Sequence, residues 1–196
     1  MSDSNFGLDR GATASTYITW KANEQRFDGA DGEVDLTSKF YVDPGSLKTG
    51  WGKLQKGMSP EWFWDKTANI LEANPGKNTE EQQLYKPAIS IEIFTQKEGY
   101  LLWTTNAVGA SNGISGILRD CYEQKDQNPG KVAGFKQKVD ENGKPMVERK
   151  SFKIGSTTVP LFEFVEWRDR PEGFVSPLPE GDIIENAPQS EEEIPF

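Results

Sequence analysis

The sequence contains no histidine and only one cysteine, Cys121, in 196 residues. The chain therefore lacks the side chain that most often acts as a general base or metal ligand, and it has no disulfide framework and no paired-thiolate metal site. No apolar run approaches the roughly 20 residues that cross a bilayer, and residues 1–10 lack the basic and then apolar pattern of a signal peptide. We expect a soluble, cytoplasmic protein that is not an enzyme and uses no cofactor, metal or membrane.

The charge is unevenly distributed along the chain. The formal net charge of −9 argues against a nucleic-acid partner, whose phosphates favour basic surfaces. Residues 171–196, however, hold seven acidic residues and no basic one, and removing them leaves 22 basic against 24 acidic residues, a net charge of −2. We expect a folded domain over residues 1–170 with room for local basic patches. The acidic, proline-interrupted residues 171–196 are predicted to be a disordered tail.

The first half of the chain predicts strands followed by helices. Residues 15–21 and 36–42 are rich in β-branched and aromatic residues, and a further pass through the sheet is expected along residues 48–56. Over residues 59–76, Ser59 suits a helix cap and Pro60 the first helical position, so we expect a helical insertion that carries Trp62 and Trp64 in packing positions. A shorter helix is expected over residues 79–85.

The second half predicts two hairpins separated by a helix. Residues 87–106 alternate around Glu98-Gly99, and residues 131–154 turn at Asn142-Gly143. Between them, residues 109–124 place an apolar stripe on one helix face: Ile114, Ile117, Leu118, Cys121 and Tyr122. A last strand is expected over residues 156–167. This order fits a mainly β chain with an OB-fold, a five-stranded Greek-key barrel with a helix between its third and fourth strands, although other small barrels and sandwiches fit it too.

The last residues of the chain, SEEEIPF, combine acidic residues with a terminal apolar pair. They resemble the tip of bacterial single-stranded DNA-binding proteins, which ends Asp-Asp-Asp-Ile-Pro-Phe and docks replication and repair enzymes. Three residues match in identity and three in charge: Ile194, Pro195 and Phe196, and Glu191, Glu192 and Glu193. The ring and carboxylate of Phe196 would fill an apolar pocket with a basic rim, and the glutamates would steer the tip toward basic partners.

The body of the chain is more similar to bacteriophage single-stranded DNA-binding proteins, which pair divergent OB-folds with acidic tails ending in phenylalanine. It lacks the opening strand and the Gly/Gln-rich linker of the bacterial family, so the bacterial tetramer is not carried over and the oligomeric state stays open. The resemblance implies a protein that coats single-stranded DNA during replication, recombination and repair and recruits replication proteins through its tip. In a phage, its location would be the bacterial host cytoplasm.

Binding of single strands without sequence preference needs exposed aromatic rings for base stacking and a groove of basic residues. A two-residue turn at Glu98-Gly99 would pair Phe94 with Trp103 and Lys97 with Tyr100, which makes Phe94 and Trp103 the first stacking pair.

Trp51, between glycines, is the second choice, and Tyr17 and Trp20 fall on opposite faces of their strand. The expected DNA contacts further include Tyr100 and these basic residues: Lys48, Lys53, Lys56, Lys97, Arg119, Lys136, Lys138 and Lys153.

Two other classes of function compete with this hypothesis. A metal-dependent nuclease would use a minimal acidic cluster of Asp140, Glu148 and Lys150. A DNA-mimicking inhibitor would carry its acidic residues over the folded body, whereas this chain concentrates seven of them in the tail. The glycine-rich segment 109–116 lacks the Lys-Ser/Thr of a phosphate-binding loop.

Overall fold

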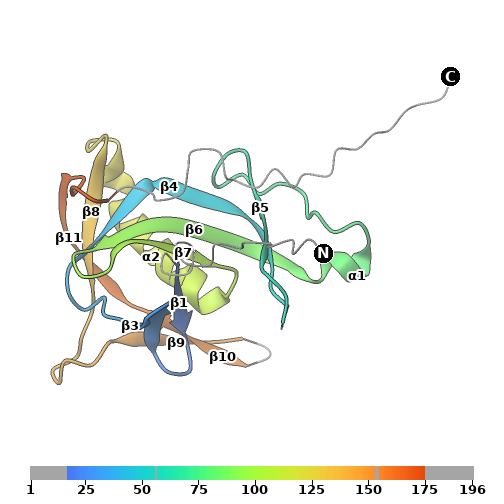
Figure 1. The fold of residues 1–196 in the computed structure, drawn as a ribbon, viewed down its shortest axis with the longest axis horizontal. Coiled ribbons are helices and arrows are strands. Elements are labelled where there is room, and N and C mark those ends of the chain that lie inside the picture. The colour runs from blue at the N-terminus through green and yellow to red at the C-terminus, as the bar shows by residue number, and fades with distance from the viewer. Residues whose placement is uncertain (1–16, 56, 153–154, 175–196) are drawn as a thin grey trace, which may run out of the picture.

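The computed structural model describes residues 17–55, 57–152 and 155–174, and the chain is mainly β (Figure 1). Two helices are present in the described residues, α1 (Thr79–Gln82) and α2 (Val108–Lys125). The strands are β1 (Tyr17–Lys21), β2 (Arg26–Gly29), β3 (Gly32–Val34), β4 (Phe40–Lys53), β5 (Glu61–Trp64), β6 (Tyr85–Thr95), β7 (Gly99–Thr105), β8 (Lys131–Gln137), β9 (Val147–Ser151), β10 (Ser156–Pro160) and β11 (Phe162–Asp169). Neither of these two helices is long and apolar enough to cross a membrane.

Nine of the described strands form one strongly curved sheet with the shape of a half-barrel (Figure 1). The strand order is β11-β8-β4-β6-β7-β1-β2-β3, and β5 pairs with the second half of β4. β1 runs parallel to β7, whereas the other neighbours are antiparallel. β9 and β10 form a separate two-stranded hairpin.

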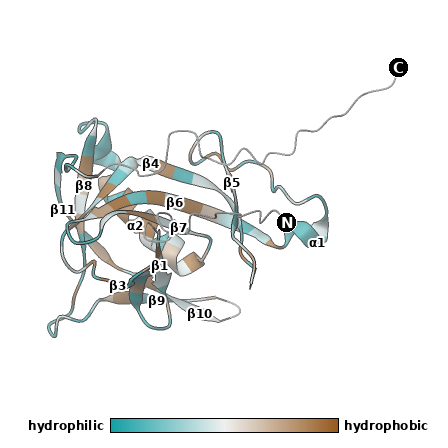
Figure 2. Cartoon of the chain, in the orientation of Figure 1, coloured by the Kyte–Doolittle hydropathy of each residue, from teal (hydrophilic) through white to brown (hydrophobic). Residues whose placement is uncertain are grey.

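The inner face of the sheet and helix α2 enclose the main hydrophobic core. From α2, Ile114 and Ile117 are fully buried, and from β6 and β7 Ile91, Ile93 and Trp103 are also fully buried. Four phenylalanines from other strands complete this core: Phe27, Phe40, Phe135 and Phe162. Figure 2 shows the hydrophobic residues concentrated in the central strands and in α2, with hydrophilic residues in α1 and the turns.

The opposite side of the sheet, called here the outer face, carries a second and smaller apolar cluster. Tyr41 of β4, Tyr100 of β7 and Val132 of β8 are buried there beneath Phe174, which follows β11 and is fully buried. The ring of Phe174 stacks on Phe94 of β6, with centroids 5.6 Å apart and planes 24° apart. Contacts with the sheet therefore continue four residues beyond Arg170.

Several elements agree with the sequence expectations. β1, α1 and the hairpin of β6 and β7 lie where they were predicted, and α2 covers the predicted helix over residues 109–124. In α2 the stripe of Ile114, Ile117 and Cys121 is buried, but Tyr122 is 75% exposed. The expected strands over 36–42 and 48–56 are a single strand, β4, which runs from Phe40 to Lys53 with an irregularity between Asp43 and Lys48.

The helix predicted over residues 59–76 is wrong. Residues Glu61–Trp64 form strand β5, and residues 65–78 contain no helix. The capping signals of Ser59 and Pro60 are outweighed because three consecutive aromatic residues can pair with β4 and pack against it, and β-sheet pairing favours aromatic residues.

The predicted register of the first hairpin is also wrong. Thr95 pairs with Gly99 across a three-residue loop, and Gly99 has a φ of 75°, which glycine adopts without strain. Phe94 therefore pairs with Tyr100, and Ile91 pairs with Trp103. The slip is an odd number of residues, so Trp103 lies on the inner face and Phe94 on the outer face.

The second hairpin and the last strand differ from the expectation in their pairing. A turn is present at Asn142-Gly143, where Gly143 has a φ of 77°, but only the bridge of Val139 and Pro145 joins the two arms. β8 pairs with β4 and β11, while β9 pairs with β10. The single strand expected over residues 156–167 is divided at Leu161 into β10 and β11.

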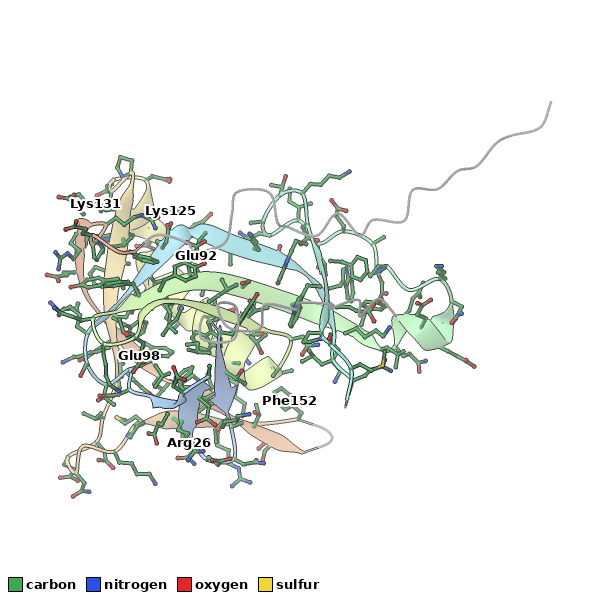
Figure 3. The ribbon with its side chains drawn as sticks, in the orientation of Figure 1. Arg26, Glu92, Glu98, Lys125, Lys131 and Phe152 are labelled. Atoms are coloured by element: carbon green, nitrogen blue, oxygen red, sulfur yellow. The ribbon has the colours of Figure 1, made fainter. Side chains whose placement is uncertain are left out.

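Phe174 offers a direct test of the outer cluster. Replacing this fully buried ring with alanine leaves a cavity over Phe94 and Tyr100, so Phe174→Ala should lower the free energy of unfolding by about 3 to 5 kcal/mol. Urea denaturation measures the change. Phe152→Ala is the matched control, because Phe152 is 48% exposed near the tip of the β9–β10 hairpin (Figure 3) and should cost less than about 0.5 kcal/mol. Equal effects of the two substitutions would contradict the packing of residues 171–174 on the sheet.

Candidate nucleic-acid interface

The outer face brings aromatic rings and charged side chains together on six strands of the sheet, β4, β5, β6, β7, β8 and β11. β4 lies at its centre, because it pairs with β6 along one edge and with β8 and then β5 along the other. Strand pairing places directly opposed residues on the same face, so the registers assign each side chain to one side of the sheet. Besides the apolar cluster under Phe174, the outer face has three parts: a tryptophan pair at β5, a polar centre on β6, and charged residues around β8 and β11.

The tryptophan pair consists of Trp62 and Trp64 of β5. Their rings stack with centroids 5.7 Å apart and planes 10° apart, and both side chains are partly exposed. Trp62 pairs with Gly52 and Trp64 with Gly50, and on the next strand Gly50 pairs with Ala88 of β6. The two rings therefore lie on the outer face.

Glycine at positions 50 and 52 permits this arrangement. A Cβ atom on Gly52 would overlap the six-membered ring of Trp62, and one on Gly50 would overlap the backbone of Phe63. The small Ala88 lies beside them, since its Cβ would be 3.2 Å from a Cβ on Gly52. The bare backbone thus provides a flat floor on which an indole ring can lie close to the sheet.

The opposite side of the same two strands carries a different group of residues. Trp51 pairs with Phe63, and its indole nitrogen donates to the carbonyl of Glu72 at 2.8 Å. Nearby, the Lys53 ammonium lies 2.7 Å from Glu61, and this contact lowers the pKa of Glu61. Tyr85 donates to the other oxygen of Glu61 at 3.1 Å. Trp51 and Lys53 therefore do not share a face with Trp62 and Trp64.

The structure separates the predicted stacking pair of Phe94 and Trp103. Trp103 is fully buried in the main core, where it makes T-shaped ring contacts with Phe27 and Phe162. Phe94 lies on the outer face beside Tyr100, but Phe174 stacks on it. The predicted pairing was wrong in register, and a base cannot stack on Phe94 while Phe174 is in place.

A polar centre lies between the tryptophan pair and the Phe94–Phe174 stack. Ser90 of β6 and Thr104 of β7 share a hydrogen bond of 2.6 Å, and the backbone N–H of Glu92 donates to the hydroxyl of Ser46 at 2.9 Å. Burial raises the pKa of Glu92 above its ordinary value, while a hydrogen bond from Tyr100 acts in the opposite direction. Figure 3 shows Glu92 in the middle of the sheet, where β4 and β6 run side by side.

The predicted basic contacts are spread over several surfaces. Lys48 pairs with Ser90 and Lys136 with Glu163, so both lie on the outer face. Lys97 is 79% exposed at the β6–β7 turn and forms an ion pair with Glu98, and Arg119 is 82% exposed on α2 beside Asp120. Lys138 is exposed just beyond β8. Lys56, Lys153 and the tip residues 191–196 lie outside the described residues.

The rival nuclease cluster does not converge in the described structure. An oxygen of Asp140 accepts hydrogen bonds from the backbone of Asn142 and Lys144 in its own turn, whereas Glu148 lies 4.0 Å from Lys150 on β9. Among the described residues, no group of three acidic or cysteine side chains could hold a metal ion. Burial raises the pKa of the Cys121 thiol to about 11, so this thiol stays protonated at neutral pH.

Trp62 and Trp64 are the residues that the sequence expectation misplaced, because it assigned them to packing on a helix. A usable signal was present in the sequence. The segment Gly50-Trp51-Gly52 has glycines two residues apart, and Trp62-Phe63-Trp64 has tryptophans two residues apart, so in strands each pair lies on one face. Glycine inside a strand often marks the close approach of another group, so the two segments are complementary in shape.

The half-buried carboxyl group of Glu92 makes stability depend on pH. Because its pKa is raised in the folded state, the folded protein binds the proton more tightly than the unfolded chain, and this contribution to stability is lost as the pH rises through the folded pKa. Glutamine is neutral at every pH, so Glu92→Gln should remove that loss. The difference in unfolding free energy, variant minus wild type, should increase from below the ordinary pKa of 4.5 toward neutral pH. Urea unfolding at a series of pH values measures it, and a difference independent of pH would contradict the burial of this group.

Comparisons with protein-family models, curated proteins and solved structures find no match for this chain. Its function is therefore inferred from the arrangement of its own residues.

Proposed function

We propose that the chain is a single-stranded DNA-binding protein whose outer face takes the strand and whose tail recruits replication and repair proteins. The observation that carries the proposal is the stacked pair of Trp62 and Trp64, partly exposed on a sheet face that also carries Lys48. Base stacking on aromatic rings tolerates any sequence, because every base has a π-face. This is the binding mode of a protein that coats single strands.

The strand order supports an OB-fold. β4, β6 and β7 are three consecutive antiparallel barrel strands, and β8 returns after α2 to pair with β4, which is the Greek-key order 4-1-2-3. β11 then pairs with β8 as the fifth strand, and α2 lies between the third and fourth. On this assignment, β5 belongs to the connection between the first and second barrel strands.

The position of the tryptophan pair agrees with that assignment. OB-folds bind oligonucleotides on the face of their second and third strands and on the connections between strands 1 and 2 and between strands 4 and 5. Here the second and third strands are β6 and β7, and the first connection is the segment 54–84, which contains β5 and α1. The tryptophan pair borders β6 through Ala88, so a base stacked on it would lie next to Ser90 and Thr104.

The tryptophan pair provides the first test of this function. Trp62→Ala and Trp64→Ala should each weaken binding of a labelled oligonucleotide by about 1 to 3 kcal/mol, because each removes a stacking surface. Fluorescence anisotropy with labelled DNA measures the affinity, and circular dichroism checks that each variant is folded.

Trp51→Ala is the matched control for this experiment. Trp51 lies on β4, directly opposite Phe63 of β5, and is also partly exposed, but its side chain is on the opposite side of the sheet. The control should bind DNA within about twofold of wild type. If Trp51→Ala weakens binding as much as the other two substitutions, the outer face is not the binding surface.

The tail is proposed to have two effects, docking of partner proteins through residues 191–196 and competition with DNA for the basic groups of the domain. A tethered segment can reach effective concentrations in the millimolar range, so a weak contact would be partly occupied. A truncation after Phe174 removes six acidic residues and keeps the ring that covers Phe94.

The truncated protein should bind a single strand more tightly than the full chain, with the largest gain at low salt, because salt screens both contacts over a Debye length of about 8 Å. The measurement is the affinity of both proteins for one oligonucleotide across a salt series. A full-length variant with those six acidic residues changed to amides should match the truncation. Identical affinities of the full chain and the truncation at low salt would leave the tail with partner docking alone.

A further inference from the structure

A row of charged contacts crosses the outer face along β4, β8 and β11. At one end, the Lys136 ammonium lies 2.7 Å from Glu163, its paired residue on β11. Next, the Lys39 ammonium lies 2.8 Å from Glu166, whose paired residue Gly134 is opposite Tyr41.

The row continues with two arginines, Arg168 of β11 and Arg170 just beyond it, which contact residues of β4. The Arg168 guanidinium lies over the ring of Tyr41, 5.0 Å from its centroid, and donates to its hydroxyl at 2.9 Å. Arg170 then forms an ion pair with Asp43 and covers Phe174. Beyond Asp43, β4 continues to Lys48 and then to Gly50 and Gly52, which pair with the tryptophan pair of β5. Four cations and three carboxylates thus form a line that leads toward the proposed stacking site.

The two lysine pairs are exposed enough to exchange partners. Lys39 and Glu166 are 43% and 40% exposed, and Lys136 and Glu163 are 48% and 42% exposed. Exposed ion pairs contribute little to folding, so a new anionic partner can replace the carboxylate at small cost. Gly134 pairs with both Glu166 and Tyr41, and a Cβ there would lie 3.3 Å from Glu166 and 3.4 Å from Tyr41.

We propose that this row is a track for the phosphodiester backbone of the bound strand, in which Glu163 and Glu166 occupy the lysines until phosphate oxygens replace them. The proposal rests on the proposed function and specifies the path of the strand, from the tryptophan pair along β4 to Lys136. Glu163 and Glu166 lower the affinity for DNA at Lys136 and Lys39, because a phosphate must displace a carboxylate at each of these two lysines.

The test compares two double variants with wild type. Glu163→Gln/Glu166→Gln frees both lysines and should bind a single-stranded oligonucleotide about three- to tenfold more tightly at low salt. Its plot of log affinity against log salt should be steeper by about 1.4, which corresponds to two further phosphate contacts. Lys39→Gln/Lys136→Gln should bind more weakly, with a shallower salt dependence. The oligonucleotide must be long enough to reach from the tryptophan pair to Lys136, which a length series establishes.

The matched control is Glu24→Gln/Glu148→Gln. It changes the net charge equally and removes the acid of two other exposed ion pairs, Arg26–Glu24 and Lys150–Glu148, which lie on the β1–β2 turn and the β9–β10 hairpin. The control should change affinity by less than about twofold. Equal gains in the control and in Glu163→Gln/Glu166→Gln would show a general charge effect and overturn the track.

The two proposals fail in different ways. If the wild-type protein binds DNA and loses affinity on Trp62→Ala, but neither the glutamate nor the lysine variant changes the affinity or the salt dependence, the track is overturned and the proposed function stands. If the wild-type protein does not bind single-stranded DNA at any salt concentration, both are overturned. Urea unfolding midpoints close to wild type confirm that each variant is folded.

Discussion

The two-sided pairing of β4 is the interaction on which the rest of the structure depends. One edge of this 14-residue strand pairs with β6 on both sides of an irregularity between Asp43 and Lys48. The other edge pairs first with β8, over residues 40–42, and then with β5, over residues 50–53. Because β4 changes partner along this edge, the charged residues of β8 and β11 and the tryptophan pair of β5 lie on one continuous face.

Glycine determines what the second half of β4 can hold. Small residues at positions 50, 52 and 88 leave the backbone bare, and the indole rings of β5 fill that space instead of side chains from β4. In the first half the equivalent positions are Tyr41 and Phe94, which fill the space themselves and are covered by Phe174. The same sheet therefore has one aromatic surface that is closed by the chain and one that is partly open.

Local sequence signals predicted the elements whose partners are close in the chain. The β6–β7 hairpin, the apolar stripe of α2 and the mainly β class follow from alternation and helical periodicity, both of which depend on nearby residues. The signals failed where a distant partner decides the outcome. Residues 61–64 follow good helix-start signals at Ser59 and Pro60, but pairing with residues 50–53 determines their conformation. The hairpin register failed because a three-residue loop, closed by Gly99 with a positive φ, replaces the expected two-residue turn.

These failures account for most of the errors in the candidate site. Because the predicted register was wrong by an odd number of residues, it placed Trp103 on the exposed face although Trp103 lies in the core. Because a helix was predicted over residues 59–76, Trp62 and Trp64 were not identified as stacking residues. The basic residues were identified by type, but their faces depend on registers that composition does not contain. Lys48 and Lys136 lie on the outer face, whereas Lys97 and Arg119 lie at a turn and on a helix.

The outer face also explains how an acidic chain could bind a polyanion. Exposed charges interact over about 8 Å at physiological ionic strength, so the local arrangement of charge matters more than the total of −9. Along β4, β8 and β11 the cations outnumber the carboxylates by one, and each carboxylate is held by a cation that a phosphate could also contact. In the proposed complex the first half of β4, together with β8 and β11, contributes a salt-sensitive part of the affinity. The tryptophan half contributes stacking, which salt screens far less, so the two halves of one strand make separable contributions to the binding of one ligand.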